Sequence, residues 1–208
     1  VGRITVDDVM DEVREQAERD YQLASGLSQD VESHDNVFRQ TTARLPWLLI
    51  GMLGGIGNSM ILGNFDTTFA AHPEMALYIP LIGGTGGNVG TQSSALVVQG
   101  LANSSLDSGN TFQQILKESV VALINATIIS MLVYIYNFIR FGATATVSYS
   151  VSISLFAVVM FASIFGTLVP MTLEKLKIDP AIATGPFISI TNDIIGMMMY
   201  MGITVLLS

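Results

Sequence analysis

Charged residues are scarce in the last four fifths of this chain, and that scarcity limits what it can fold into. Of 17 acidic and nine basic residues, ten and five lie in residues 1–44, which leaves seven and four among the 164 positions of 45–208. Soluble domains carry about 25% charged residues, whereas this chain carries 12% and has a mean hydropathy of +0.54. The sequence therefore predicts an all-α, polytopic membrane protein.

Five segments are long and apolar enough to cross a hydrocarbon core of about 30 Å. They lie near 46–65, 75–101, 115–138, 151–173 and 181–207. Residues 27–44 are predicted to form a polar linker, and Pro46 and Trp47 to open the first span at the level of the lipid headgroups. The expected organisation is a cytoplasmic arm over 1–44 and a five-helix membrane domain over 45–208.

The basic residues predict the orientation of these spans. The arginines of the arm precede the first span, Lys117 follows the second, and Lys175 and Lys177 follow the fourth. Only Arg140 falls on the opposite side. Because cytoplasmic loops carry an excess of Lys and Arg, we expect a cytoplasmic N-terminus and an external C-terminus.

The composition excludes several kinds of function. Without cysteine the chain can form no disulfide scaffold, zinc finger or thiol nucleophile. A net charge of −8 argues against a nucleic-acid partner. The sequence contains neither a nucleophile–base pair nor a phosphate-binding loop, so we expect that it is not an enzyme.

The cytoplasmic arm is predicted to be mainly one helix. Residues 2–6 are typical of a short strand, after which Asp7 or Asp8 would cap a helix that ends near Ala24. Acidic residues gather along this helix at Asp7, Asp8, Asp11, Glu12, Glu15, Glu18 and Asp20. They form either an ordinary solvated face or a cytosolic sensor of divalent cations, because hard cations bind clustered carboxylates.

One carboxylate lies deep within a predicted span. Asp193 is the only ionisable residue near the centre of any span, close to the midpoint of 181–207. An isolated charge there costs at least about 2.5–3.5 kcal/mol, so this carboxylate must face a polar cavity, a partner or an ion. Gly185 and Ser189 precede it at intervals of four and are expected on the same helix face. We interpret Asp193 as functional in preference to a neutral, structural aspartate.

The second span contains five glycines in the eight residues 83–90. Each destabilises a regular helix by about 1 kcal/mol. The run therefore predicts either irregular backbone beside a wet cavity or close helix packing through GxxxG pairs. Packing alone does not explain Asn88, Thr91 and Gln92, whose oxygens suit a hydrated cation. We expect this segment to line a pore or a binding site.

The polar side chains also indicate the kind of ion. Oxygen donors alone favour hard cations over zinc or copper. One acid per chain is too few for a divalent ion, but a two-fold dimer would bring two Asp193 carboxylates together. Mg2+ keeps several of its waters and therefore fits a sparse polar ring better than Ca2+ does. Selectivity among Mg2+, Mn2+, Co2+ and Ca2+ stays open at this point.

Three stretches resemble the MgtE magnesium channel/transporter family. They read RLPWLL (44–49), GGNVGTQS (86–93) and SITNDIIG (189–196), and their order and spacing match that family over the whole chain. The resemblance implies that 1–26 are the end of a CBS domain running into the family's plug helix. It also implies that further cytosolic domains precede Val1.

The resemblance implies a homodimer in a lipid membrane, with the pore on the two-fold axis. Asp193 matches the family's pore carboxylate, and Asp179 matches an acid near the cytoplasmic mouth that contributes to regulatory Mg2+ binding. Asn88, Gly185 and Ser189 match pore-lining positions of the family. We expect Gly84 and Thr91 to line the pore as well. On the plug helix, the candidate regulatory ligands are Glu15, Glu18 and Asp20.

Two positions depart from the family pattern. Gln99 stands where members usually carry arginine, and Arg19 interrupts the acidic pattern of the plug helix. The second departure weakens any direct transfer of the sensor ligands to this chain.

The predicted function is passive, potential-driven uptake of hydrated Mg2+ across the inner membrane through a dimeric pore. A proton-coupled divalent-cation transporter, in which Asp193 titrates, is the alternative. A third possibility is a membrane scaffold or sensor that transports nothing, in which the glycines only pack helices.

Overall fold

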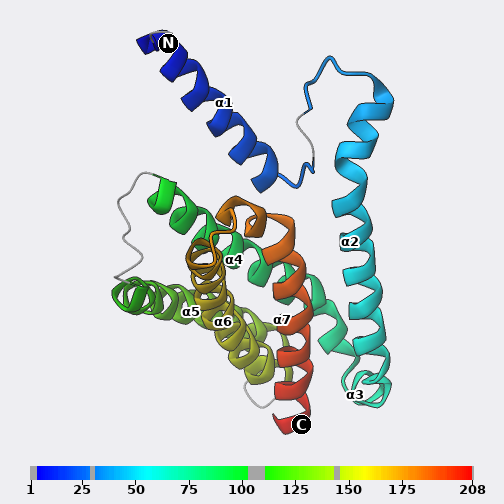
Figure 1. The fold of residues 1–208 in the computed structure, drawn as a ribbon. Coiled ribbons are helices and arrows are strands. Elements are labelled where there is room, and N and C mark those ends of the chain that lie inside the picture. The colour runs from blue at the N-terminus through cyan, green and yellow to red at the C-terminus, as the bar shows by residue number, and fades with distance from the viewer. Residues whose placement is uncertain (1–3, 29–30, 103–110, 143–145, 208) are drawn as a thin grey trace.

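The structure, a computed structural model, describes residues 4–28, 31–102, 111–142 and 146–207, and all regular structure in these ranges is helical (Figure 1). The α-helices are α1 (Val6–Ala24), α2 (Val37–Gly63), α3 (Asp66–Ala71), α4 (Ile79–Ala102), α5 (Thr111–Phe141), α6 (Thr146–Lys175) and α7 (Pro186–Leu207). The short 3-10 helices η1 (Pro73–Tyr78) and η3 (Pro180–Ala183) lead into α4 and α7. The predicted all-α class is confirmed for the described residues.

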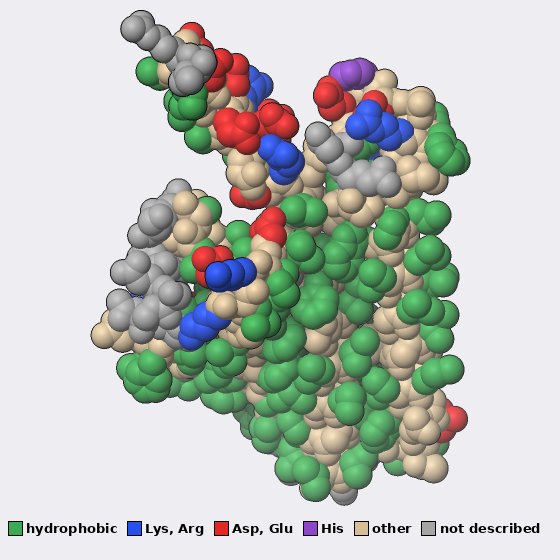
Figure 2. Space-filling model, in the orientation of Figure 1, with side chains coloured by type: hydrophobic (Ala, Val, Ile, Leu, Met, Phe, Trp, Pro, Cys, Tyr) green, Lys and Arg blue, Asp and Glu red, His purple; other side chains and the backbone are tan. Residues whose placement is uncertain are grey.

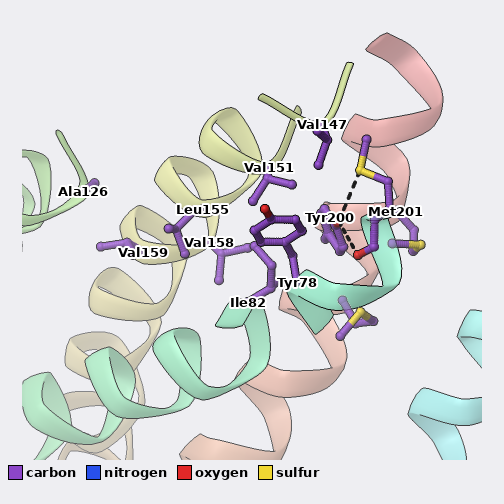
Figure 3. Packing of buried hydrophobic residues seen from close by; sticks show 12 residues of the cluster. Tyr78, Ile82, Ala126, Val147, Val151, Leu155, Val158, Val159, Tyr200 and Met201 are labelled. Atoms are coloured by element: carbon purple, nitrogen blue, oxygen red, sulfur yellow. Dashed lines mark hydrogen bonds between the residues drawn. The ribbon is translucent and has the colours of Figure 1, made fainter. Parts of the chain in front are cut away.

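Helix α6 is the centre of the bundle. It packs against α4, α5 and α7, and its buried residues recur along its length from Val147 to Met171. The hydrophobic core joins Leu155 and Val158 of α6 to Ile82 of α4 (Figure 3). A helix that is apolar on most of its faces is expected either in a protein core or in a membrane, and α6 is the most buried of the apolar helices.

Buried tyrosines tie the segment before α4 to the rest of the bundle. The Tyr200 hydroxyl on α7 donates to the backbone carbonyl of Met75 at 2.8 Å, as the close-up in Figure 3 shows. The Tyr78 hydroxyl donates to the side-chain carbonyl of Asn137 on α5. An unpaired buried polar group costs about 1–3 kcal/mol, so these bonds let the polar ends of large side chains enter the core.

Helices α1 and α2 stand apart from this bundle. Helix α2 packs mainly against α7 and exposes most of its surface, and α1 projects from the end of the bundle where α7 begins (Figure 1). Gly54 makes the α2–α7 contact close, because a Cβ there would lie 2.5 Å from the Ile190 side chain. The predicted boundary at residue 44 falls inside α2, and the division into arm and membrane domain stays a prediction.

Four helices are long and apolar enough to span a membrane, namely α2, α5, α6 and α7. The space-filling view shows a body covered by hydrophobic side chains, with most charges gathered around α1 and the adjoining end (Figure 2). Helix α4 has 24 residues and packs against α6 and α7, but its polar residues keep it out of the set of four. The prediction that this segment, the second of the five predicted spans, also crosses the membrane therefore stays a prediction.

The start of α1 differs from the prediction. Thr5 caps the helix in place of Asp7 or Asp8: its side chain accepts from the Asp8 backbone N–H, and the Asp8 carboxylate accepts from Thr5 in return. This capping box satisfies N–H groups that have no helical partner. The hydrogen bonds from Thr5 hold the pKa of Asp8 below its ordinary value. The predicted strand falls partly outside the described residues, and its last residue, Val6, is helical.

The first span also begins earlier than predicted. Asn36 caps α2 by accepting from the Arg39 backbone N–H at 2.9 Å, so much of the supposed linker is helical. Pro46 does not open the helix but lies inside it. A proline removes one helical hydrogen bond, and here the turns on either side keep the helix continuous.

Helix α7 is shorter than predicted, because η3 and a turn occupy residues 180–185. Gly185 has a φ of +58°, a left-handed conformation that favours glycine, and it precedes the helix. Asp193 is therefore about two turns from the start of α7, not at the midpoint of the span as predicted.

A test of the packing is Gly166→Ala on α6. A Cβ at Gly166 would overlap the backbone carbonyl of Gly90 on α4, and a backbone obstacle cannot rotate away. We expect the free energy of unfolding to fall by about 1–3 kcal/mol, measured by thermal unfolding in detergent.

The matched control is Gly57→Ala on α2, where a Cβ would meet nothing within 4 Å. This variant should keep its stability or become more stable through the better helix propensity of alanine. If Gly166→Ala unfolded no earlier than Gly57→Ala, the close α4–α6 contact would be wrong.

Candidate functional site

Asp193 on α7 lies against a bare stretch of the α4 backbone. A Cβ added at Gly87 would be 3.3 Å from Oδ1 of Asp193, and one added at Gly83 would be 3.5 Å from the same oxygen. Ser189, one turn earlier on α7, faces the same stretch, since its Oγ would be 2.8 Å from a Cβ at Gly87. Because Gly83 and Gly87 have no side chains, the carboxylate and the hydroxyl lie directly over α4.

The Asp193 carboxylate makes no hydrogen bond and no ion pair with the described residues. It is half-buried, on a helix that is apolar enough to span a membrane. Desolvating an unpaired carboxylate costs several kcal/mol, so water, a proton or a cation must complete its surroundings. Of the residues described here, this is the clearest place for a cation.

The glycine-rich segment is a regular part of α4, so the expectation of irregular backbone is wrong. Close packing is the reason. A Cβ at Gly86 would be 2.9 Å from the Val158 side chain, and one at Gly90 would overlap the Asn192 carboxamide. The favourable packing that this close approach allows outweighs the low helix propensity of glycine.

A second face of α4 is open. Gly84 and Asn88 are exposed, and Thr91, one further turn along, is partly buried. A Cβ at Gly84 would meet nothing within 4 Å. Three of the predicted pore-lining residues thus form one stripe at helical spacing, which no described element covers.

The prediction that Gly185 shares a helix face with Ser189 and Asp193 is wrong. Gly185 precedes α7, and a Cβ on it would overlap the backbone carbonyl of Ala24 at the end of α1. It therefore permits the close contact between the end of α1 and the turn that precedes α7. The Ser189 backbone N–H donates to the Gly185 carbonyl at 3.0 Å, which begins the helix.

A cavity of about 810 Å³ lies beside this junction. Its lining comes from the end of α1, from α2 and from α7, and includes Gly26, Arg44, Trp47 and Ser189. Ser189 is one turn from Asp193 along α7, but Asp193 itself is not among the residues that line the cavity.

Asp179 is an exposed helix cap in the structure. Its Oδ1 accepts from the Ala181 backbone N–H at 2.9 Å at the start of η3. No described contact joins Asp179 to Asp193. A capping role is thus established in the structure, and its predicted role in Mg2+ binding stays a prediction.

The three candidate regulatory acids are paired within α1 itself. Glu15 lies 3.4 Å from Arg19, Glu18 lies 3.1 Å from Arg14, and Asp20 accepts from Gln16 at 2.7 Å. In the part of the chain that the structure describes, no group of three or more acidic or histidine side chains could hold a metal. A metal sensor on this helix would need ligands from elsewhere.

The sequence analysis missed Glu118. This carboxylate is only 9% exposed, and its Oε1 accepts from the hydroxyls of Ser93 at 2.6 Å and Ser163 at 2.5 Å. The predicted span began at residue 115, which placed Glu118 close to the start of the span and the membrane surface. In the structure α5 begins earlier, at Thr111. The signal was weak, because only the fold brings serines of α4 and α6 to this acid.

Comparison with known proteins identifies the family of this chain. Residues 79–203 match the sequence model of the MgtE family, described as a divalent cation transporter. That description is of a transporter, which confirms the prediction that the chain is not an enzyme.

Curated relatives match nearly the whole chain. The magnesium transporter MgtE of Bacillus subtilis is 32% identical over 98% of it, and that of Enterococcus faecalis is 30% identical over 98%. The magnesium transporter MgtE of Thermus thermophilus is 32% identical over the full chain. The chain spans 44–46% of the length of these relatives. This chain therefore belongs to the MgtE family of divalent cation transporters.

Proposed function

We propose that this chain forms a homodimeric channel through which hydrated Mg2+ crosses the inner membrane passively. The observation that carries the proposal is the unpartnered Asp193 carboxylate over the bare α4 backbone at Gly83 and Gly87. The named relatives are magnesium transporters, which supports Mg2+ as the transported ion.

The open stripe of α4 supports a pore on a dimer axis. Gly84, Asn88 and Thr91 give α4 a polar face that no described element covers. Carboxamide and hydroxyl groups are costly against lipid, so a second copy across a two-fold axis is the natural cover. The two copies would then enclose a polar path between their α4 helices.

The same symmetry supplies the charge for a divalent ion. Two Asp193 carboxylates, one from each copy, neutralise one Mg2+. Oxygens of Ser189 and Asn88 would contact its water shell, and the glycines leave room for those waters. Because Mg2+ releases water reluctantly, contact through water is the expected mode. Membrane potential contributes about 2.3 kcal/mol per charge per 100 mV, or about 4.6 for Mg2+.

In the proposed topology α4 crosses the membrane together with α2, α5, α6 and α7, which makes five spans. Its neighbours and the second copy shield it from lipid. The N-terminus is cytoplasmic and the C-terminus is outside, because Lys117, Lys175 and Lys177 lie opposite Arg140. The cavity beside Ser189 would then be the cytoplasmic mouth.

Regulation is proposed at that same mouth. Asp179 and the acids of α1, namely Glu15, Glu18 and Asp20, would bind Mg2+ together with cytosolic domains that precede this chain. Gly185 supports the idea, since its contact with Ala24 couples α1 to the start of α7.

A proton-coupled transporter is the second candidate. It rests on the same observation, because an unpaired carboxylate in a low-dielectric site can take up a proton. In that mechanism Asp193 would exchange a proton for the cation during transport.

Replacing the carboxylate tests both mechanisms. In proteoliposomes at fixed membrane potential, Asp193→Asn should lower Mg2+ uptake at least about tenfold, because losing 1.4 kcal/mol of attraction already has that effect. Uptake is followed with a trapped Mg2+-sensitive dye, with and without a pH gradient. Asp66→Asn, an exposed acid of α3, is the control and should conduct nearly as well as the wild type.

The outcomes separate the candidates. Wild-type uptake without a pH gradient supports the channel. Uptake that requires the gradient, and loses this requirement in Asp193→Asn, supports the proton-coupled transporter. Uptake by Asp193→Asn equal to that of the wild type would show that Asp193 is structural, and wild-type uptake equal to empty liposomes would favour the scaffold.

Cross-linking tests the dimer axis. The chain has no cysteine, so Asn88→Cys introduces a single thiol, which should form a disulfide with its copy under mild oxidation in membranes. Ile128→Cys, on the exposed face of α5, is the matched control and should stay monomeric on a non-reducing gel. Equal cross-linking of the two variants would contradict an axis beside α4.

A further inference from the structure

Three oxygen atoms from three helices meet inside the bundle, away from Asp193. Oε1 of Glu118 on α5 lies 2.6 Å from the Ser93 hydroxyl on α4 and 2.5 Å from the Ser163 hydroxyl on α6. The two hydroxyl oxygens lie 3.0 Å apart. All three side chains are buried. We call this group the Glu118 cluster.

The Glu118 cluster borders a cavity of about 380 Å³ between α4, α5 and α6. A water molecule occupies about 30 Å³ in the liquid, so the cavity has room for several. Its lining adds the carboxamides of Gln92, Gln114 and Asn125. The cavity thus has several side chains with oxygen atoms near one carboxylate, beside the apolar Val89, Leu96 and Val121.

The carboxylate is only half satisfied. Both serine hydroxyls donate to Oε1, whereas Oε2 accepts no hydrogen bond from the residues that the structure describes. Lys117 also lines the cavity, but it is exposed, and no ion pair within 4 Å joins it to Glu118. A buried carboxylate without a counter-charge costs several kcal/mol, so a positive ion in the cavity would stabilise it.

We propose that the Glu118 cluster binds one monovalent alkali cation in each protomer, at a site separate from Asp193. Oxygen donors without nitrogen or sulfur select a hard cation. A single carboxylate balances a single positive charge, whereas a divalent ion would leave net charge in a low-dielectric site. While it donates to Oε1, each serine hydroxyl keeps lone pairs that can face the ion, and cavity waters and carboxamide oxygens complete its shell.

The proposed cation site lies where α4, α5 and α6 meet. The cation would join α4 to α5 and α6 through Ser93, while Gly83 and Gly87 on another face of α4 lie under Asp193. A cation bound at the Glu118 cluster would therefore fix the position of α4, the helix that carries the proposed pore-lining residues. Binding itself does not depend on the proposed channel function.

The test measures thermal unfolding of the whole chain in detergent, with EDTA to remove divalent ions. NaCl, KCl and LiCl are each compared with N-methylglucamine chloride at equal ionic strength. At least one alkali cation should raise the wild-type Tm in a saturable manner, since a ligand that binds only the folded state stabilises it. Glu118→Gln should need at least about tenfold more of that cation for the same shift.

Further variants separate the site from its neighbours. Asp193→Asn should keep the alkali-dependent shift even where it loses Mg2+ uptake, so failure of this site and failure of the channel are distinguishable. Ser163→Ala should weaken the shift while retaining the carboxylate, and it serves as the second variant if Glu118→Gln does not fold. Equilibrium binding of 22Na+ to the wild type, and its reduction in Ser93→Ala, gives an independent readout.

Several results would overturn the proposal. They are a wild-type Tm equal in alkali and N-methylglucamine salts, an unchanged shift in Glu118→Gln, and a Mg2+-dependent rise that requires Glu118. Lys117→Gln decides whether Lys117 or a bound cation balances the Glu118 charge. If Lys117 were the resident counter-charge, this variant would lose stability in N-methylglucamine and only then respond to alkali cations. A bound cation instead predicts an equal or larger shift in Lys117→Gln.

Discussion

Contact between helix backbones is the constraint on which the rest of this structure depends. In a bilayer, lipid tails are as apolar as the side chains they meet, so helices associate by close packing and by polar contacts. Gly166 of α6 meets the backbone of α4 at Gly90, and Gly90 in turn receives the Asn192 carboxamide of α7. These contacts bring α4 against both of its neighbours, at distances that any larger residue would prevent.

That close approach brings polar groups of α4 into reach of acids on other helices. On one face, Gly83 and Gly87 leave the Asp193 carboxylate beside bare backbone. On another, Ser93 reaches Glu118 and Ser163. Helix α4 is thus less apolar than its neighbours because it carries two polar environments, and its position against α6 and α7 makes this tolerable.

The sequence predicted the general organisation well, because it depends on composition. The scarcity of charge after residue 44 predicted helices that cross a membrane, and four helices of the described residues are long and apolar enough to do so. The family resemblance, carried by the segments at 44–49, 86–93 and 189–196, is confirmed by the family match. Asp193 could be singled out because a carboxylate inside an apolar segment carries a high desolvation cost, which only a polar cavity, a partner or an ion can offset.

The sequence failed where neighbours in space decide. The glycine run was compatible with irregular backbone until α6 and α7 were seen to fill its surface, and Gly185 fitted a helical spacing although a left-handed turn precedes α7. Pro46 resembled a helix start because a proline is favourable there, yet Asn36 caps the helix earlier.

The sequence by itself thus determined that the chain is helical and membrane-embedded and that Asp193 lies inside an apolar segment, since length, hydrophobicity and charge can be read from each segment alone. Only the tertiary structure decided which face of α4 meets Asp193, that Gly185 contacts α1, and that Glu118 is buried with two serines. The physical reason is that burial and close approach belong to pairs of helices, and the pairing of helices is not encoded in the spacing of residues within any one of them.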